Sequence, residues 1–527
     1  MRRLWFNGKV VSMDKAMTRY EAIGTENDKI VFLGSSQEGL AQSWDETRDL
    51  KGAMVLPGFS DTHMHMLYYA MFQKNVALFG VPSIEDIVAR CRERIEQNHP
   101  DYLLGMGWNQ ENMAEGRMPN REDMDRISTE IPVCMLRTCA HIAACNSVML
   151  ERIRALKGVD PETLSHVDFI NGLLREDAMR LYMEVFPKAD DAYVRELVEI
   201  GQKGLNAAGI TCVHSDDLKV IAGMDPIHLI GLFREMEAEG KLTVRVFEQC
   251  LVDQTEFDRL LKVRSDPADR TSLFRTGPRK LLQDGSLGAK SAEMIDGYVD
   301  DRDNHGIPIY TEEELYTWVK AAHDQHMDVA VHAIGDLALQ KVCDAIYKAQ
   351  KENPWPDHRH GIVHAQTTSP ALLRLMMVMG LQAYIQPIFI DADMNIIEER
   401  VGKRHAKDCY NWKSMEDLGI RVSGGSDCPV EPFDVLDNMR AAITRQNRAG
   451  TRTYLPEQAL SVEQAIRLFT SDAAWACRDE DVRGTLETGK LADLVVLERD
   501  LFETDPKDFP KVQVLETVLN GKTVYQA

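Results

Sequence analysis

The central part of the chain alternates short apolar runs with longer segments of helical periodicity. Each run ends in a polar residue or a glycine-rich turn, and the runs occupy residues 57–59, 210–213, 242–247, 280–282, 329–331, 361–363, 381–385 and 421–423. Continuous apolar runs of this length are typical of strands that are buried on both faces of a parallel sheet. Eight strand–helix units in succession predict an α/β fold, a (β/α)8 TIM barrel.

The segments between these runs carry helix start and stop signals. Thr311 and Glu314 form the pattern of a capping box in front of an apolar periodicity. Ser369 precedes a proline, which is the order of an N-cap and a first helical residue, and Gly380 follows the last apolar position of that helix. These signals support the assignment of helices between the predicted strands.

One interval is too long for a single crossover helix. It runs from His65 to Ile210 and contains strand-like pieces of its own at residues 102–106 and 132–136. We therefore expect an insertion of about residues 68–185 after the first barrel strand. Loops that follow barrel strands lie at the C-terminal face, so the insertion is expected to cover the active site.

The two ends of the chain resemble each other. Residues 5–11 and 518–524 both place Asn-Gly between apolar positions, which is a hairpin signal. Further strand-like runs lie at residues 30–33 and 494–497. Because an isolated hairpin is only marginally stable, we predict one small β-domain from residues 1–56 and 478–527, with the barrel at 57–477. The alternative is two unrelated edge hairpins.

Composition narrows the classes of partner. The 527 residues include 61 Lys and Arg against 83 Asp and Glu, a net charge of −22 that repels nucleic acid and anionic lipid. No apolar stretch has the length of a signal peptide core or a membrane helix. The ten cysteines are scattered without a CxxC pair, which favours a reducing compartment. These features predict a cytoplasmic protein that acts on a small molecule, and they leave open whether it forms a homo-oligomer.

Metal-ligand residue types follow several of the predicted strands. His63 and His65 are two positions apart, so in a strand they point to the same side and can hold one ion. His332 and His364 follow strands one β/α unit apart, and Asp427 follows the last strand. Each residue also has an ordinary interpretation: a surface coincidence for the HxH pair, core histidines for the next two, and a turn or N-cap aspartate for Asp427.

Lys280 opens the fourth predicted strand and is expected to point inward, with a salt bridge to Asp284 as the ordinary alternative. The order HxH, Lys, His, His, Asp along the strands resembles the amidohydrolase superfamily. The similarity is closest to its N-substituted formamide deformylase-like branch, and the segments that carry it are residues 56–65, 105–108, 282–288, 332–336, 364–366, 425–430 and 489–497.

The resemblance implies a metal-dependent barrel flanked by a β-sandwich made from both termini. It implies a carboxylated lysine that bridges two divalent ions, and zinc is the expected metal, although nitrogen and oxygen ligands also accept iron, manganese or nickel. The ligand set that it implies is His63, His65, Lys280, His332, His364 and Asp427. Asp427 is also the expected general base and acid, because it could take a proton from water and give it to a leaving amine.

Four further residues are weaker candidates. His214 and His141 are candidate catalytic residues, and for each a structural role is an equal alternative. Trp108 and Gln386 are candidate substrate-binding residues. The chain departs from the branch at Asn109, at residues 137–141, at Val363 and at Lys290. The first two departures lie in the predicted insertion and bear on the substrate, not on the metal site.

Three functions remain from the sequence. The first is metal-dependent hydrolysis of a C–N bond in an amide or an N-substituted formamide. The second keeps the same site but cleaves a C–O bond, as a lactonase or esterase does. The third is a non-catalytic, regulatory protein on an amidohydrolase-like barrel. That class typically loses metal ligands, whereas this sequence retains the whole set, so we expect an enzyme.

Overall fold

The computed structural model describes residues 1–527 apart from 79, 111–112, 138–141, 187–188 and 222, and apart from the side chain of residue 177. The chain divides into two compact units. The barrel unit comprises Met1–Met66, Gly201–Val220 and Asp225–Ala527, and the inserted unit comprises Leu67–Ile200 and Ile221–Met224. We describe each unit by itself.

The barrel unit contains one sheet of eight parallel strands, which confirms the predicted TIM barrel. In sheet order they are β8 (Phe59–Met64), β15 (Ile210–Ser215), β16 (Arg245–Leu251), β17 (Phe274–Leu282), β18 (Val329–Ala333), β19 (Gly361–His364), β20 (Gln382–Ile385) and β21 (Arg421–Gly424). The Asp61 carboxylate on β8 accepts hydrogen bonds from the Ser426 backbone N–H at 3.1 Å and its hydroxyl at 2.6 Å. Asp61 thereby joins the first strand to the end of the last.

The fourth barrel strand, β17, begins six positions before the predicted run. The apolar pattern fails there because buried arginines interrupt it. Arg275 pairs with Asp479 at 2.6 Å, and the Arg279 guanidinium lies 4.1 Å from the ring centroid of Phe257. Arginine can occupy a strand interior when its guanidinium is paired or stacked, and single-residue hydropathy does not reveal that.

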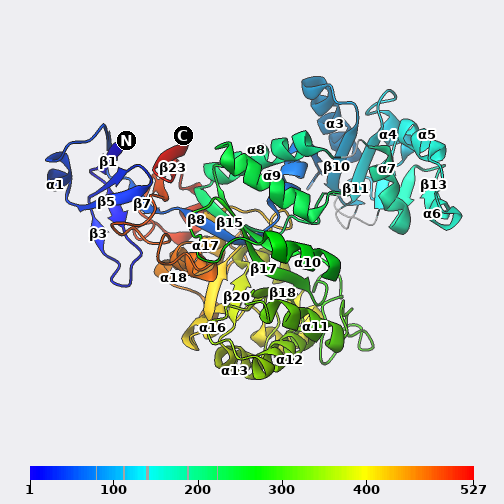
Figure 1. Cartoon of the computed structure of the whole chain (residues 1–527). Coiled ribbons are helices and arrows are strands. Elements are labelled where there is room, and N and C mark those ends of the chain that lie inside the picture. The colour runs from blue at the N-terminus through cyan, green and yellow to red at the C-terminus, as the bar shows by residue number, and fades with distance from the viewer. Residues whose placement is uncertain (79, 111–112, 138–141, 187–188, 222) are drawn as a thin grey trace. The chain divides into compact units, whose positions relative to one another are not determined.

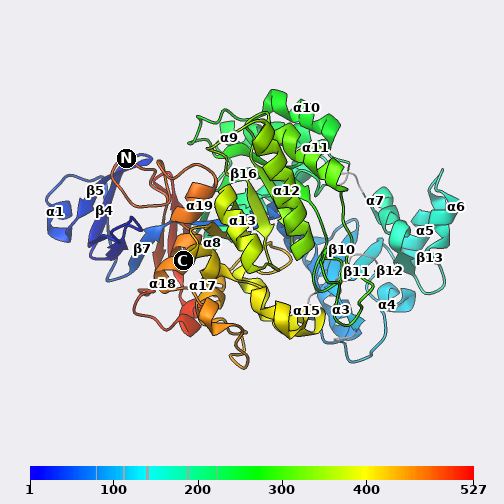
Figure 2. The same ribbon diagram turned by 90° about the horizontal axis from the view of Figure 1, so that it is seen from below.

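Helices surround the barrel strands, and α11, α12 and α13 lie side by side outside them (Figure 2). The helices are α9 (Pro226–Ala238), α10 (Gln254–Val263), α11 (Glu312–His323), α12 (Asp336–Glu352), α13 (Pro370–Met379), α14 (Ile390–Asp393), α15 (Ile397–His405), α16 (Trp412–Asp417), α17 (Val435–Thr444), α18 (Val462–Leu468) and α19 (Ser471–Ala476). The predicted signals are confirmed: Thr311 caps α11 in a capping box, Ser369 caps α13, and Gly380 ends α13 with φ +66°.

Both chain ends form a β-sandwich, as Figure 1 shows by the neighbouring N and C labels. One sheet has the order β5 (Lys29–Gly34), β4 (Ala22–Glu26), β1 (Arg2–Phe6), β6 (Glu46–Asp49), and a short helix, α1 (Ser36–Leu40), follows β5. The other has the order β24 (Lys522–Gln526), β23 (Val514–Leu519), β22 (Leu494–Leu497), β7 (Met54–Pro57), β2 (Lys9–Val11), β3 (Arg19–Tyr20). Apolar side chains of both sheets, among them Trp5, Ile23, Val55 and Val496, are buried in one cluster.

The two Asn-Gly pairs behave differently. Asn520 and Gly521 both have positive φ, 49° and 70°, as a type I′ turn requires, and they join β23 to β24 as a hairpin. The predicted hairpin at Asn7-Gly8 is wrong, because β1 and β2 belong to different sheets. Only Asn7 of that pair has positive φ. A Cβ at Gly8 would lie 2.3 Å from Cδ1 of Leu50. Glycine therefore allows the backbone to pass close to Leu50 where the chain crosses from β1 to β2.

The inserted unit has its own mixed sheet. Its strand order is β13 (Val167–Asp168), β14 (Leu173–Arg175), β12 (Ile142–Cys145), β11 (Val133–Arg137), β10 (Leu103–Trp108), β9 (Val76–Ala77). The helices of this part of the chain are α2 (Met66–Lys74), α3 (Ile84–Asn98), α4 (Arg121–Asp125), α5 (Ser147–Ala155), α6 (Pro161–Ser165) and α7 (Leu181–Val185), and α8 (Asp191–Ala207) continues into the barrel unit. β10 and β11 confirm the predicted strands, and a cover over the active site stays a prediction. Among the described residues no helix is long and apolar enough to cross a membrane.

Two buried, hydrogen-bonded histidines, His323 and His360, link α11 to two barrel strands. The Nε2–H of His323 donates to the Asn353 carbonyl at 2.6 Å, which leaves Nδ1 of His323 as an acceptor. That nitrogen lies 2.9 Å from Nε2 of His360, whose Nδ1 accepts from the backbone N–H of Val329 at 3.1 Å. All ring nitrogens of His323 and His360 have hydrogen-bond partners only when both rings are neutral.

We expect this arrangement to make stability depend on pH. Burial, with His358 and His323 nearby, holds the pKa of His360 well below its ordinary 6.5, so the unfolded chain binds a proton that the folded chain excludes. The contribution to stability is therefore complete above pH 6.5 and is lost as pH falls, by up to about 1.4 kcal/mol per pH unit. Two more charged groups face the ring of His360. Oδ1 of Asp328 lies 3.7 Å from its Nδ1, and the Arg478 cation is the other.

Unfolding free energies from denaturant titrations between pH 8 and pH 5 measure this effect. The His360→Gln variant is the control, because it keeps a polar side chain but has nothing to titrate. Its stability should fall less steeply below pH 6.5 than that of the natural protein. Equal slopes for the two proteins would contradict the assignment to His360.

Candidate metal centre

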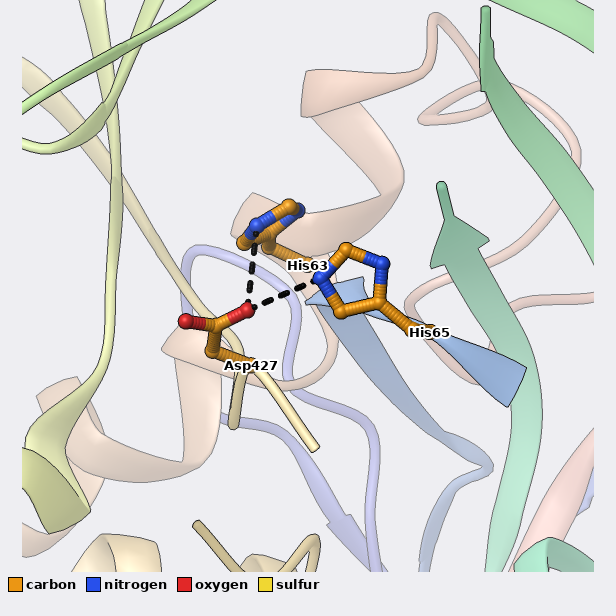
Figure 3. A group of neighbouring side chains, drawn as sticks. All are labelled: His63, His65 and Asp427. Atoms are coloured by element: carbon orange, nitrogen blue, oxygen red, sulfur yellow. Dashed lines mark ion pairs between the residues drawn. The ribbon is translucent and has the colours of Figure 1, made fainter. Parts of the chain in front are cut away.

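Three potential ligands from opposite ends of the barrel sequence meet at one point (Figure 3). Oδ1 of Asp427 lies 3.3 Å from Nε2 of His63 and 3.2 Å from Nε2 of His65. These residues each offer one ligand atom, and the three atoms lie within 4.8 Å of one another. His63 is on β8, His65 follows it, and Asp427 follows β21, so barrel closure creates the group. Two imidazoles and a carboxylate are ligands that suit a divalent ion.

The other predicted histidines extend this group along the strand ends. The ring centroids of His63 and His364 are 5.7 Å apart, and those of His364 and His332 are 4.4 Å apart. His332 is the residue before the last in β18 and His364 is the last residue of β19, so both lie at the same edge of the parallel sheet. The four histidines and the aspartate therefore form one continuous cluster.

Lys280 also points into the cluster. Its Nζ lies 3.1 Å from Nε2 of His63 and 3.5 Å from Oδ2 of Asp216, and the side chain is buried. The alternative salt bridge to Asp284 is wrong, because the Asp284 carboxylate accepts backbone N–H groups of residues 293, 334 and 335. Lysine thus occupies the position on the fourth strand that the sequence assigned to it.

The backbone around the cluster is unusual. Asp427 has φ +58° and His364 has φ +78°, conformations that non-glycine residues rarely adopt. A Cβ at Gly425 would lie 2.6 Å from the backbone nitrogen of His63, so glycine allows the last strand to approach the first. Backbone strain of this kind concentrates at functional sites, and here it aims Asp427 toward the histidines. Asp427 does open a turn, because its backbone carbonyl accepts from the N–H of Val430 at 2.9 Å, but its carboxylate contacts the histidines, and the N-cap of α17 is Asp434.

Two glutamines fix the orientation of two histidine rings. Nδ1 of His63 lies 2.8 Å from Oε1 of Gln249, and Nδ1 of His364 lies 2.7 Å from Oε1 of Gln386. Each amide nitrogen donates to a strand carbonyl, of Thr62 at 3.1 Å and of Tyr384 at 3.0 Å, which fixes the oxygen toward the ring. Both Nδ1 atoms therefore carry the hydrogen, and both Nε2 atoms present a lone pair.

Backbone carbonyls hold the other two rings. Nδ1 of His65 lies 2.7 Å from the carbonyl oxygen of Asp216, and Nε2 of His332 lies 3.0 Å from that of Gly285. A carbonyl can only accept, so each of these ring nitrogens donates. His65 thus presents Nε2 to the cluster, whereas His332 presents Nδ1.

The histidines of the cluster differ in pKa because their electrostatic surroundings differ. Burial, then the nearby Lys280 cation, lowers the pKa of His63 to about 4, and the same two causes lower that of His332 to about 4. Burial also lowers the pKa of His65, but the hydrogen bond to Asp427 and the negative charges of Asp216 and Asp427 together outweigh burial and raise the pKa to about 9. Although burial alone would raise the pKa of Asp427, its contacts with His63 and His65 and the charges of the neighbouring histidines hold that pKa well below the usual range. Without metal, His65 is an imidazolium paired with the Asp427 carboxylate.

These donors fit a divalent ion. The neutral rings of His63, His332 and His364 have free lone pairs, and the anionic Asp427 supplies a negative charge at the same point. An ion at His65 would replace the proton on Nε2, so binding should release a proton.

Two of the remaining candidates, His214 and Trp108, lie away from the cluster. His214 is buried in β15, with its ring against Phe247 and Tyr384, and does not join the cluster. Trp108 is buried in the inserted unit, where its indole N–H donates to the carbonyl of Met135 at 2.7 Å. His141 lies outside the described residues. The amide of Gln386 is used by His364 and a backbone carbonyl, so the structure gives it a positioning role, and substrate contacts of Gln386 and Trp108 stay predictions.

Sequence reasoning missed Gln249 and Asp216. Gln249 stands among the buried residues of β16, and a polar residue inside a buried strand is a usable signal. Asp216 holds His65 through its backbone carbonyl, which no side-chain pattern can reveal, and its carboxylate lies 3.5 Å from Nζ of Lys280.

We expect Gln249→Leu to weaken metal binding about 10–100-fold, because the hydrogen on Nδ1 of His63 loses its acceptor and the ring loses its fixed tautomer. Competition with a chromophoric chelator measures the affinity without reference to turnover. Gln249→Glu is the matched comparison, since it restores an acceptor and should recover binding. Unchanged affinity in the leucine variant would contradict the positioning role.

A TIM barrel with this ligand cluster defines a metal-dependent hydrolase, and comparison with known proteins names the family. The model of the Amidohydrolase family matches residues 46–525, so the chain belongs to that family. YtcJ of Bacillus subtilis, which its name assigns to the amidohydrolases, is 31% identical over 540 residues, covering 100% of both chains. The N-substituted formamide deformylase of Arthrobacter pascens is 26% identical over 99% of this chain and 97% of its own.

Solved structures give the same result. The crystal structure of an uncharacterized metal-dependent hydrolase from Pyrococcus furiosus matches with a TM-score of 0.78 and 28% identity, over 95% of this chain and 100% of that chain. The resemblance to amidohydrolases inferred from the motifs is thereby confirmed, and the protein is a hydrolase of the metal-dependent amidohydrolase superfamily.

Proposed function

We propose that this protein hydrolyses a C–N bond, in an amide or N-substituted formamide, with two divalent ions, most simply zinc, held by His63, His65, Lys280, His332, His364 and Asp427. The observation that carries the proposal is the Asp427 carboxylate, which is buried, anionic and in contact with two histidines. The similarity to N-substituted formamide deformylase along the whole chain supports the choice of bond. The acidic composition of the present chain supports a cytoplasmic location and a small-molecule substrate.

Each residue has a defined task. Bound divalent ions would lower the pKa of a water molecule toward neutrality and polarise the substrate carbonyl. Asp427 accepts a proton from that water and delivers it to the leaving nitrogen, because an amine departs far more readily when protonated. Gln249 and Gln386 keep the lone pairs of His63 and His364 directed at the cluster.

Lys280 completes the proposal for two ions. Carboxylation of its amine would convert a cation into an anion at a position 3.1 Å from His63, and this anion would help the histidines to hold two divalent ions. Mass analysis of the Lys280 peptide from native protein, together with the metal-to-chain ratio, tests this step. One ion per chain with full activity and unmodified Lys280 would leave a single-metal hydrolase.

The deciding experiment is metal analysis of the purified protein followed by assay on matched libraries of amides, N-substituted formamides and lactones. We expect turnover of the C–N substrates that depends on bound metal. Preferential turnover of lactones would assign the site to C–O cleavage. Stoichiometric metal without turnover of any class would support a binding or regulatory role.

A further inference from the structure

The turn that follows β17 carries a buried carboxyl group, Asp284, which completes the pairing of β17 with β18. In a parallel sheet a residue donates its N–H to the next strand and accepts from the N–H two positions further along that strand. The N–H of Gln283 donates to the carbonyl of His332 at 3.0 Å, as this pattern requires. The carbonyl of Gln283, however, accepts from the N–H of Ile309 at 2.8 Å, and Oδ1 of Asp284 accepts from that of Ile334 at 3.0 Å. The side chain of Asp284 thus replaces the missing acceptor.

Both oxygens of the Asp284 carboxyl group accept backbone N–H groups. Oδ2 accepts from the N–H of Glu293 and from that of Gly335, each at 2.8 Å. Together with Oδ1, they join the loop that follows β17 to the loop that follows β18. Burial raises the pKa of Asp284 to about 7, but a carboxyl group keeps acceptor oxygens in either protonation state, so these contacts do not depend on its charge.

The backbone around Asp284 is closely packed. A Cβ at Gly335 would lie 2.0 Å from the carbonyl oxygen of Glu293, and a Cβ at Gly285 would lie 2.2 Å from Oγ of Ser291. Glycine at these two positions lets the two loops approach each other directly. The hydrogen bonds of Asp284 therefore hold the residues that follow His332 in a defined place.

The same side chain also reaches the ring of His332. Oδ1 of Asp284 lies 3.4 Å from Nε2 of His332, and the carbonyl oxygen of Gly285 lies 3.0 Å from that nitrogen. Two oxygen atoms beside Nε2 favour the tautomer that carries its hydrogen there, which leaves the lone pair on Nδ1. His332 pairs with Leu282, two positions after Lys280 on β17, so the same turn links two of the proposed metal ligands.

We propose that Asp284 is a positioning residue, which holds His332 in the tautomer and orientation that bind metal through Nδ1. The inference rests on the proposed function, because it takes His332 as a ligand of the bound ions. Asp284 acts through His332: its backbone contacts fix the end of β18, and Oδ1 helps to fix the ring. Loss of one of its oxygens should therefore weaken metal binding.

Asp284→Asn is the test variant. Both oxygens of Asp284 accept N–H groups, whereas an asparagine amide has one oxygen, so at least one backbone N–H would face an NH2 group. Asp336→Asn is the matched control. Asp336 is buried, lies in the segment after β18, and accepts at Oδ1 from the N–H of Ile295 at 2.9 Å, a contact that asparagine can keep.

Two measurements follow the metal and not the reaction: the affinity for Co²⁺ in competition with a chelator, and the visible spectrum of the cobalt-loaded protein. We expect Asp284→Asn to bind Co²⁺ about 10–100-fold more weakly and to change the spectrum, because one ligand is no longer fixed. Asp336→Asn should match the unaltered protein in both. If Asp284→Asn lowered only the thermal stability of the metal-free protein, with affinity and spectrum unchanged, the proposal would be overturned.

The tautomer of His332 gives a second test, which does not require Asp284→Asn to fold. In metal-free protein with isotope-labelled histidine, nitrogen NMR should find the hydrogen on Nε2 of His332, with the signal assigned by comparison with His332→Gln. A hydrogen on Nδ1 would overturn the proposal. If the unaltered protein bound no metal, the proposed function would fail, and the tautomer would still decide the role of Asp284.

Discussion

Asp427→Asn is expected to lower kcat by at least about 10²–10⁴-fold while bound metal and fold are retained. Asparagine keeps the size of the side chain and one acceptor oxygen, but it cannot take up and release a proton near neutral pH. General acid–base catalysis contributes a factor of this size, and an amine that leaves unprotonated is a poor leaving group. Four histidines remain as ligands, so metal analysis should find most of the ions in place.

The matched control is Asp434→Asn, seven positions along the chain. Asp434 caps α17 through its bonds to the N–H groups of Leu436 and Asp437, and asparagine is an equally good N-cap. This variant should keep its kcat, measured on the best substrate from the library. Near-normal turnover of Asp427→Asn would show that another group carries the proton.

Complete removal of metal should abolish turnover and also lower thermal stability. Without ions the cluster holds Lys280 and a protonated His65 in a buried site, balanced by Asp427 and Asp216. An ion that binds only the folded state stabilises it by about 2.7 kcal/mol when its free concentration is 100 times the dissociation constant. Dialysis against a chelator, followed by calorimetry and assay, measures both losses.

Re-addition of single metals then identifies the ions that the site accepts. Activity should return only with those metals that also restore the thermal midpoint, because both effects arise from the same ligands. His326→Gln is a suitable control variant, since His326 packs against Trp355 and lies apart from the metal cluster. Full activity after verified removal of all metal would contradict the proposed chemistry.

The barrel could be predicted, and so could the positions of the candidate ligands, because the local sequence pattern shows which segments are buried strands and where each strand ends. Each apolar run has a polar residue at its end, and His63, His332, His364 and Asp427 all occupy such ends. The early start of β17 could not be predicted in this way, because Arg275 and Arg279 are buried through contacts with distant residues.

Tertiary contacts also decided the roles of the weaker candidates. Gln386 was predicted from the sequence as a substrate-binding residue, but only the structure shows that its amide is used by His364. Gln249 contacts His63 from a strand far away in sequence, so spacing gives no hint of the pair. His214 ends an apolar run like the metal ligands do, yet its side chain joins a different group, beside Cys477.

The mixed sheet of the sandwich has a consequence for biosynthesis. β7 leads through Gly58 directly into β8, the strand that carries His63, and one edge of β7 pairs with β22 near the end of the chain. The N–H of Gly58 also donates to the carbonyl of Asp493. A ribosome delivers β22 long after β7, so the nascent chain waits with an unpaired strand edge beside His63 and His65. The anchor of the HxH strand therefore forms only after residues 494–497 have been made, and chains that terminate before residue 494 should accumulate as aggregates without metal.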